Sequence, residues 1–298
     1  MISKFFHKKA SLNKEDNSIN FKNIINKLKQ NKLAMIGIII LAVLITSAII
    51  APFLTKYKMD DIDLFNISAA PNTDHILGTD DLGRDVFTRL FSGGRVSLGV
   101  GIFATLIQIL IGVTLGAVSG YYGGFIDSIV MRLVDIIMCF PLFIIAVALA
   151  AVMGPSIWNL IIIIAILSWT GIARIVRAEV LSLKEREFIE ASRALGLNDF
   201  EIIRKHVLPN ILSPILVSAT LAIADAILTE AALSFLGMGV KPPQPSWGNM
   251  LSAAQSMRTL RYEWWLWVPP GLLIFFTVLS INFLGDGLRD IMDPKEKL

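Results

Sequence analysis

The sequence contains a single cysteine and only three histidines among its 298 residues. Cys139 alone cannot form an internal disulfide or a cysteine-based metal cluster, and His7, His75 and His206 lack the spacing of metal ligands. The sequence also lacks the G-x4-G-K-[ST] phosphate loop, so the chain has no P-loop with which to bind ATP. No Ser/His/Asp grouping forms a readable catalytic motif. We therefore expect no enzymatic activity, no metal and no cofactor in this chain.

Charged residues are also scarce. Asp, Glu, Lys and Arg make up 17% of the chain, whereas a typical soluble domain carries about 25%. Hydrophobic residues make up 54%, and the mean hydropathy is +0.66. A soluble fold of this length could not bury so much apolar surface, so we expect lipid to be the solvent. The formal net charge of +3 is small, and we expect no nucleic-acid partner.

Apolar runs long enough to cross a bilayer, which takes about 20 residues, predict an all-α membrane protein. The uncharged stretch 136–173 is too long for one crossing. Gly154-Pro155 divides it in two, because glycine and proline interrupt helices. The sequence therefore predicts six transmembrane helices, at 33–54, 96–120, 129–152, 157–177, 211–235 and 264–285.

The second predicted span carries a stripe of small residues, Gly112-x3-Gly116-x3-Gly120. Residues four apart lie on one face of a helix, and small side chains there let two helix backbones approach closely in lipid. We expect this stripe to be a packing face, and it carries no information about a substrate.

The distribution of lysine and arginine predicts the orientation. If the N-terminus lies inside, most lysines and arginines fall in the inner segments, as is typical of cytoplasmic loops. The sequence therefore predicts that both termini are cytoplasmic. The first apolar run is longer, and begins later, than that of a secretory signal, which favours a retained span over a cleaved peptide. The predicted organisation is a basic tail 1–32, a first span 33–54, an extracytoplasmic loop 55–95, a core membrane domain 96–285 with a cytoplasmic loop 180–210, and a cytoplasmic tail 286–298.

The N-terminal tail shows helical periodicity near its end. Phe21, Ile24, Ile25 and Leu28 follow the spacing of an amphipathic helix among lysines and asparagines. We expect this helix to lie on the inner membrane surface. Residues 1–18 fit a disordered basic tail equally well.

The cytoplasmic loop 180–210 predicts two short helices around a turn. The first, about 184–195, ends at Gly196, because glycine readily takes the left-handed conformation that closes a helix. Asn198 caps the second helix, with Glu201 in the position that completes a capping box, and Pro209 ends it. The loop is too apolar for a connector, and its apolar residues predict a protein partner: Phe188, Ile189, Leu197, Phe200 and Ile203.

Two acidic residues, Asp225 and Glu230, interrupt the fifth span. A charge near the bilayer centre is costly, by at least ~2.5–3.5 kcal/mol, so such residues face a cavity or a partner group. Asp225 is the deeper and is a candidate for lining a translocation path or for pairing between helices, with a structural ion pair or a protonated carboxyl between helices as the alternative. Glu230 is a candidate for the same two roles, but it lies nearer the outer end, where we expect water or interface groups to be able to satisfy it.

The loop also resembles a known motif. The pattern Glu190-Ala191-Ser192-x3-Gly196-x9-His206-x-Leu208-Pro209 is similar to the EAA motif of ABC importer permeases, from which it departs at Ser192 and His206. In that family the loop is the coupling helix that docks into a groove on a cytoplasmic ATPase. The resemblance implies an ATPase-coupling role for these residues: Glu190, Ala191, Ser192, Gly196, His206, Leu208 and Pro209.

Three further segments, 76–98, 234–250 and 282–290, resemble the C-type subunit of the dipeptide/oligopeptide/nickel permease family. The resemblance implies the type I ABC importer permease fold in the cell membrane and transport of di- or oligopeptides by alternating access. It implies as partners a related permease subunit, two ATPases that bind ATP-Mg, and an extracytoplasmic substrate-binding protein. Nickel or a metal–chelator complex is the alternative cargo. An ATP-independent secondary transporter or a membrane enzyme is a remote alternative.

Overall fold

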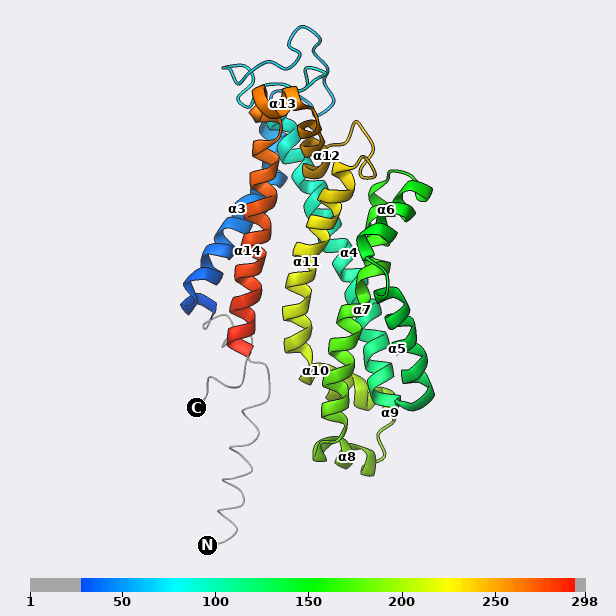
Figure 1. Ribbon diagram of the computed structural model, residues 1–298. Helices are drawn as coiled ribbons and strands as arrows, with labels where there is room; N and C mark the ends of the chain where they lie inside the picture. The colour runs from blue at the N-terminus through cyan, green and yellow to red at the C-terminus, as the bar shows by residue number, and fades with distance from the viewer. Residues whose placement is uncertain (1–27, 293–298) are drawn as a thin grey trace.

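The computed structural model describes residues 28–292, and this part of the chain is helical with no β-strands (Figure 1). Five helices are long and apolar enough to span a membrane: α3 (Lys32–Leu54), α4 (Val86–Tyr122), α7 (Ile157–Lys184), α11 (Leu212–Phe235) and α14 (Val268–Met292). A bent pair, α5 (Gly124–Met138) and α6 (Leu142–Met153), corresponds to the third predicted span and brings the number of spans in the described residues to six. The prediction of an all-α membrane protein is confirmed.

The third span is not the continuous helix predicted at 129–152. Its two halves meet at an angle of 83° on either side of Pro141, which precedes α6. Proline has no backbone N–H and its ring clashes with the preceding turn, so the helix cannot continue through it. The prediction was wrong here because the surrounding residues are uniformly apolar and carry no polar sign of a break.

The second span begins ten residues earlier than predicted, inside the expected outer loop 55–95. The helix starts where the Asp85 carboxylate accepts the Thr88 N–H (2.8 Å) and the Thr88 hydroxyl (2.7 Å). Arg95 then contacts the end of α3, donating to the carbonyls of Ala48 (2.8 Å) and Ile49 (2.6 Å). Charged residues in this first part of α4 are therefore paired within the helix bundle.

Two other boundaries differ from the prediction. Helix α7 continues beyond residue 177 to Lys184, and α14 runs to Met292, so the first part of the predicted tail 286–298 is helical. The predicted amphipathic helix and the basic tail lie largely in residues 1–27, outside the described residues.

The glycine stripe of α4 is the packing face against α7, as predicted. A Cβ at Gly116 would lie 2.6 Å from the Ala173 carbonyl oxygen, and one at Gly112 or Gly120 would lie 2.9 Å from a carbonyl oxygen of α7. Each distance is too short for any side chain. The backbones of α4 and α7 therefore touch directly at three positions, each about one helical turn from the next.

The polypeptide gathers its long connections at the two ends of the bundle (Figure 1). The segment between α3 and α4 lies at one end, together with α12 (Trp247–Leu251) and α13 (Met257–Tyr262). The connection between α7 and α11 lies at the opposite end, toward which α3 begins and α14 ends. The start of α3 and the end of α14 thus lie toward the same end of the bundle as the predicted coupling loop.

Candidate functional site

The predicted coupling loop folds as a helical hairpin between α7 and α11. We define the hairpin as α8 (Glu187–Ala194), α9 (Asp199–Ile202), the π-helical segment η1 (Ile203–Val207) and α10 (Leu208–Asn210). Two short helices around a turn were predicted, and the structure has them. Pro209 does not end the second helix: it is the second residue of α10, which follows the π-helical segment without a break, and helical geometry is lost only at Ile211.

Gly196 closes α8 with a complete Schellman motif. Its φ of +82° is in the left-handed region that glycine adopts without strain. The Leu197 N–H donates to the Ser192 carbonyl (3.2 Å), and the Gly196 N–H donates to the Arg193 carbonyl (2.9 Å). A Cβ at this position would meet no atom within 4 Å. The requirement for glycine is therefore conformational and not one of space.

Asn198 caps α9 as predicted, accepting the Glu201 N–H on its side-chain oxygen at 2.8 Å. The Glu201 carboxylate pairs with Lys205 Nζ at 2.8 Å, one turn later, in place of completing a capping box. The hydrogen bond from Lys205 lowers the pKa of the Glu201 carboxyl. The turn between α8 and α9 is thus held by local hydrogen bonds on both sides.

The inner face of the hairpin packs on α7. Ile189, Ile202 and Val207 are fully buried and share one apolar cluster with Val176 and Val180 of α7. Burial of a side chain of this size contributes roughly 1.5–3 kcal/mol. The hairpin is therefore an extension of the membrane bundle.

The outer face of the hairpin carries exposed apolar side chains. Phe188, Leu195 and Phe200 are 38%, 80% and 69% exposed. The apolar residues that the sequence grouped together are therefore divided: Ile189 is buried, Leu197 and Ile203 pack on the cluster beneath, and Phe188 and Phe200 remain outside. Exposed aromatic and aliphatic side chains on a polar hairpin are typical of a protein-docking surface.

The residues of the predicted motif occupy different environments. Glu190, Ala191, Gly196 and Pro209 are exposed, and His206 and Leu208 are half-buried. Ser192 is buried, and its hydroxyl donates to the Phe188 carbonyl at 2.7 Å. The small residue at this position is therefore an inward-facing part of α8.

Tyr121, which the sequence did not single out, connects the end of α4 to the hairpin. Its hydroxyl donates to Asp199 Oδ1 at 2.8 Å and lies 3.4 Å from Arg193 Nε, which donates to it. The Arg193 guanidinium lies over the Tyr121 ring, 5.2 Å from its centroid. The only signal in the sequence is a tyrosine pair before Gly123 at the end of a span, which does not indicate this contact.

The two acidic residues of α11 have opposite environments. Asp225 is exposed on the described chain, whereas Glu230 is fully buried. The Ser97 hydroxyl donates to Glu230 Oε2 at 2.8 Å, and the Ser234 hydroxyl donates to Oε1 at 2.7 Å. The expectation that water or interface groups satisfy Glu230 is wrong. The segment around α12 folds back over the C-terminal end of α11 and encloses Glu230, with Gly248 against Ala231.

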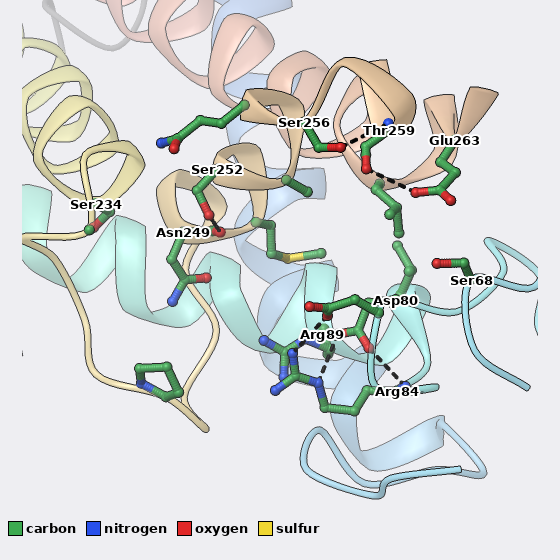
Figure 2. Close-up of a pocket in the computed structure, with 18 of the residues that line it drawn as sticks. Ser68, Asp80, Arg84, Arg89, Ser234, Asn249, Ser252, Ser256, Thr259 and Glu263 are labelled. Atoms are coloured by element: carbon green, nitrogen blue, oxygen red, sulfur yellow. Dashed lines mark hydrogen bonds and ion pairs between the residues drawn. The ribbon is translucent and has the colours of Figure 1, made fainter. Parts of the chain in front are cut away.

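A cavity of about 860 Å³, lined by charged, polar and apolar side chains, lies at the opposite end of the molecule, between the α3–α4 segment, the start of α4 and residues 234–266 (Figure 2). Asp80 accepts from Arg84 Nε at 2.7 Å and pairs with Arg89 Nε at 3.3 Å. Arg89 is 6% exposed and also donates to the carbonyls of Met59 (2.9 Å) and Pro243 (3.3 Å). Arg89 therefore ties the α3–α4 segment and the segment around Pro243 to the first turn of α4.

Comparison with known proteins agrees with this architecture. Residues 112–298 match the family described as binding-protein-dependent transport system inner membrane component, and residues 20–71 match the N-terminal TM domain of oligopeptide transport permease C. The dipeptide transport system permease protein DppC of Alkalihalophilus pseudofirmus is 46% identical over 271 residues, covering 91% of this chain and 88% of that protein. The oligopeptide transport system permease protein OppC of Bacillus subtilis is 42% identical over 275 residues, covering 92% and 90%.

A solved structure shares the fold. A chain of the MetNI methionine ABC transporter, in an inward-facing conformation, matches with a TM-score of 0.56 at 22% identity, covering 69% of this chain and 97% of that one. At this identity the likeness concerns the fold alone, and it supports the helical bundle described above.

Proposed function

Because the chain belongs to the family of binding-protein-dependent transport system inner membrane components, and is thus a multi-pass permease subunit of an ABC importer, we propose that it transports dipeptides and oligopeptides across the cell membrane. The names of its relatives support this cargo, since the dipeptide and oligopeptide permeases match over nearly their whole length. Nickel or a metal–chelator complex is the alternative that the experiment below excludes or supports.

Permeases of this family work with ATPase and substrate-binding partners. The assembly that we propose contains this chain, one related permease subunit, two cytoplasmic ATPases and one extracytoplasmic binding protein. ATP and Mg²⁺ bind to the ATPases, in keeping with the lack of a phosphate loop in this sequence. This chain contributes the membrane path and the surface that receives the ATPase movement.

The observation that carries the coupling role is the hairpin, which is buried against α7 on one face and presents Phe188, Leu195 and Phe200 on the other. A fixed apolar surface on the inner side of a bundle can dock into a groove on a partner and follow its movement as a rigid body. ATP-driven closure of the ATPases then moves the two permeases between outward-open and inward-open states. Glu190, Ala191, Gly196 and Pro209 are the exposed motif residues that we place in or beside this contact.

Asp225 is the residue of α11 that we propose for the path or for pairing with the related permease. It is exposed in this chain, in contrast to the enclosed Glu230. A carboxylate exposed to lipid is costly, so a cavity or a partner group should cover Asp225 in the assembled transporter.

Reconstitution of the full complex in liposomes tests the proposed function. ATP hydrolysis should rise when the binding protein is loaded with peptides of several lengths and should not rise with Ni²⁺. Stimulation by Ni²⁺ or a nickel chelate alone would replace the peptide cargo with the metal alternative. Uptake by the purified chain without ATPases would contradict the importer mechanism itself.

A further inference from the structure

Helix α4 connects the two ends of the molecule. It is one unbroken helix of 37 residues, reaching from the outer cavity to the hairpin (Figure 1). Arg89 in its first turn holds the carbonyls of Met59 and Pro243. Tyr121 at its other end contacts Asp199 and Arg193 of the hairpin. A displacement of either end of α4 is therefore transmitted along a stiff element to the other.

The hairpin is attached to the α4–α7 pair in three ways. The covalent attachment is the end of α7, which leads into α8 through the two residues 185–186. The apolar cluster beneath the hairpin adds burial, but burial is non-directional and does not fix an angle. A hydrogen bond does fix an angle, and Tyr121 makes such bonds with both α8 and α9.

We propose that Tyr121 is a positioning residue that ties the hairpin to α4, so that movement imposed on the hairpin by an ATPase reaches the outer cavity. This inference rests on the proposed coupling role of the hairpin. Without the Tyr121 hydroxyl, the hairpin keeps its fold and its docking surface but can shift relative to α4 about its covalent links to α7 and α11. ATP hydrolysis then continues while less of its movement reaches the membrane helices.

Tyr121→Phe tests this tie, because it removes the hydroxyl and keeps the ring beneath Arg193. The variant is assembled into the full complex in liposomes, and peptide uptake is measured per ATP hydrolysed, using a binding protein loaded with a peptide mixture. Uptake per ATP should fall by roughly tenfold, the low end of what losing a hydrogen bond to a charged group costs. Basal ATP hydrolysis and the amount of assembled complex should stay at the wild-type level.

The matched control is Tyr122→Phe, which removes the hydroxyl of the next residue, whose side chain is 47% exposed. It should leave uptake per ATP unchanged. Asp199→Ala should reproduce the loss seen in Tyr121→Phe, and the double variant should be no worse than either single one, because both remove the same contact. Asp199→Asn keeps an acceptor oxygen and should restore most of the coupling.

Wild-type uptake per ATP in Tyr121→Phe would overturn the inference. A loss of uptake in proportion to a loss of assembled complex would also overturn it, because Tyr121 would then be needed for assembly and not for coupling. Phe200→Ala, measured in the same series, separates this failure from a failure of the proposed function. If Phe200→Ala impairs transport and Tyr121→Phe does not, the positioning role of Tyr121 is wrong. If neither variant impairs transport, the coupling role of the hairpin is wrong.

Discussion

Ser97 of α4 donates a hydrogen bond to Glu230 Oε2 of α11 at 2.8 Å, and the same Ser97 oxygen accepts the backbone N–H of Trp247 at 3.1 Å. One hydroxyl thus connects three elements: two membrane helices and the start of α12. The Trp247 indole N–H continues the link by donating to the Leu90 carbonyl at 2.9 Å. Glu230 therefore has a structural role, because through Ser97 it holds the segment that contains α12 on the helix bundle.

Replacing Glu230 should destabilise the protein, and more so when the new side chain offers no acceptor to the Ser97 and Ser234 hydroxyls. Glu230→Ala leaves the buried hydroxyls of Ser97 and Ser234 without their acceptor and opens a cavity, which should cost about 2–4 kcal/mol. Glu230→Gln keeps an acceptor oxygen and should cost less than about 1 kcal/mol. Thermal unfolding of the purified protein in detergent measures the difference. Asp225→Ala, at an exposed position of the same helix, is the control, and an equal loss in both alanine variants would contradict the structural role of Glu230.

Replacing Gly196 should impair coupling through backbone strain. Any L side chain at φ +82° is strained, by roughly 1–2 kcal/mol, although the site has room for a Cβ. Gly196→Asp should therefore distort the turn and lower peptide uptake per ATP while the protein still inserts into the membrane. Gly196→Asn should be milder, because asparagine tolerates the left-handed region. Gly171→Ala, a helical glycine that also has no atom within 4 Å of a Cβ, should behave like wild type. Normal uptake in Gly196→Asp would argue against the coupling assignment.

Replacing Gly116 should separate α4 from α7. A Cβ there would lie 2.6 Å from the Ala173 carbonyl oxygen, a backbone atom that cannot move aside alone. Gly116→Ala should lower stability by about 1–3 kcal/mol, as overpacking of a close contact does. Gly99→Ala, on the same helix where a Cβ meets nothing within 4 Å, should be neutral or slightly stabilising. The two variants are compared by thermal unfolding, and similar melting temperatures would refute the direct backbone contact.

Local chemistry accounts for what the sequence predicted well. The apolar runs predicted the spans because the lipid bilayer directly limits the length and composition of a helix that crosses it. Gly196 and Asn198 predicted the hairpin turn because the conformational preference of each residue is intrinsic to that residue. The bend at Pro141 was missed because its neighbours are apolar on both sides. The early start of α4 was missed because the charged residues Arg89 and Arg95 suggested a loop outside the span. Their carbonyl partners are distant in sequence, so the sequence does not show that both arginines are paired.

The enclosure of Glu230 and the contacts of Tyr121 could not be predicted for the same reason. Glu230 is covered by α12, which begins 17 residues later in the sequence but returns to pack on α11 and α4. Tyr121 meets Asp199 across 78 positions of sequence. Contacts of this kind depend on the tertiary arrangement of whole helices, and no single-residue preference indicates them.

The exposed face of the hairpin should decide whether the ATPases bind. Phe200 is 69% exposed, so Phe200→Ser should leave the fold of the chain intact and should lower co-purification of the ATPases by roughly tenfold or more, as truncation of an aromatic anchor at an interface does. The matched control is Phe65→Ser, which replaces a fully exposed phenylalanine in the α3–α4 segment at the opposite end of the molecule. That variant should retain the ATPases, since its side chain lies on the predicted outer side. Equal loss of ATPases in both variants would point to general misfolding, and full retention in Phe200→Ser would show that docking depends on another surface.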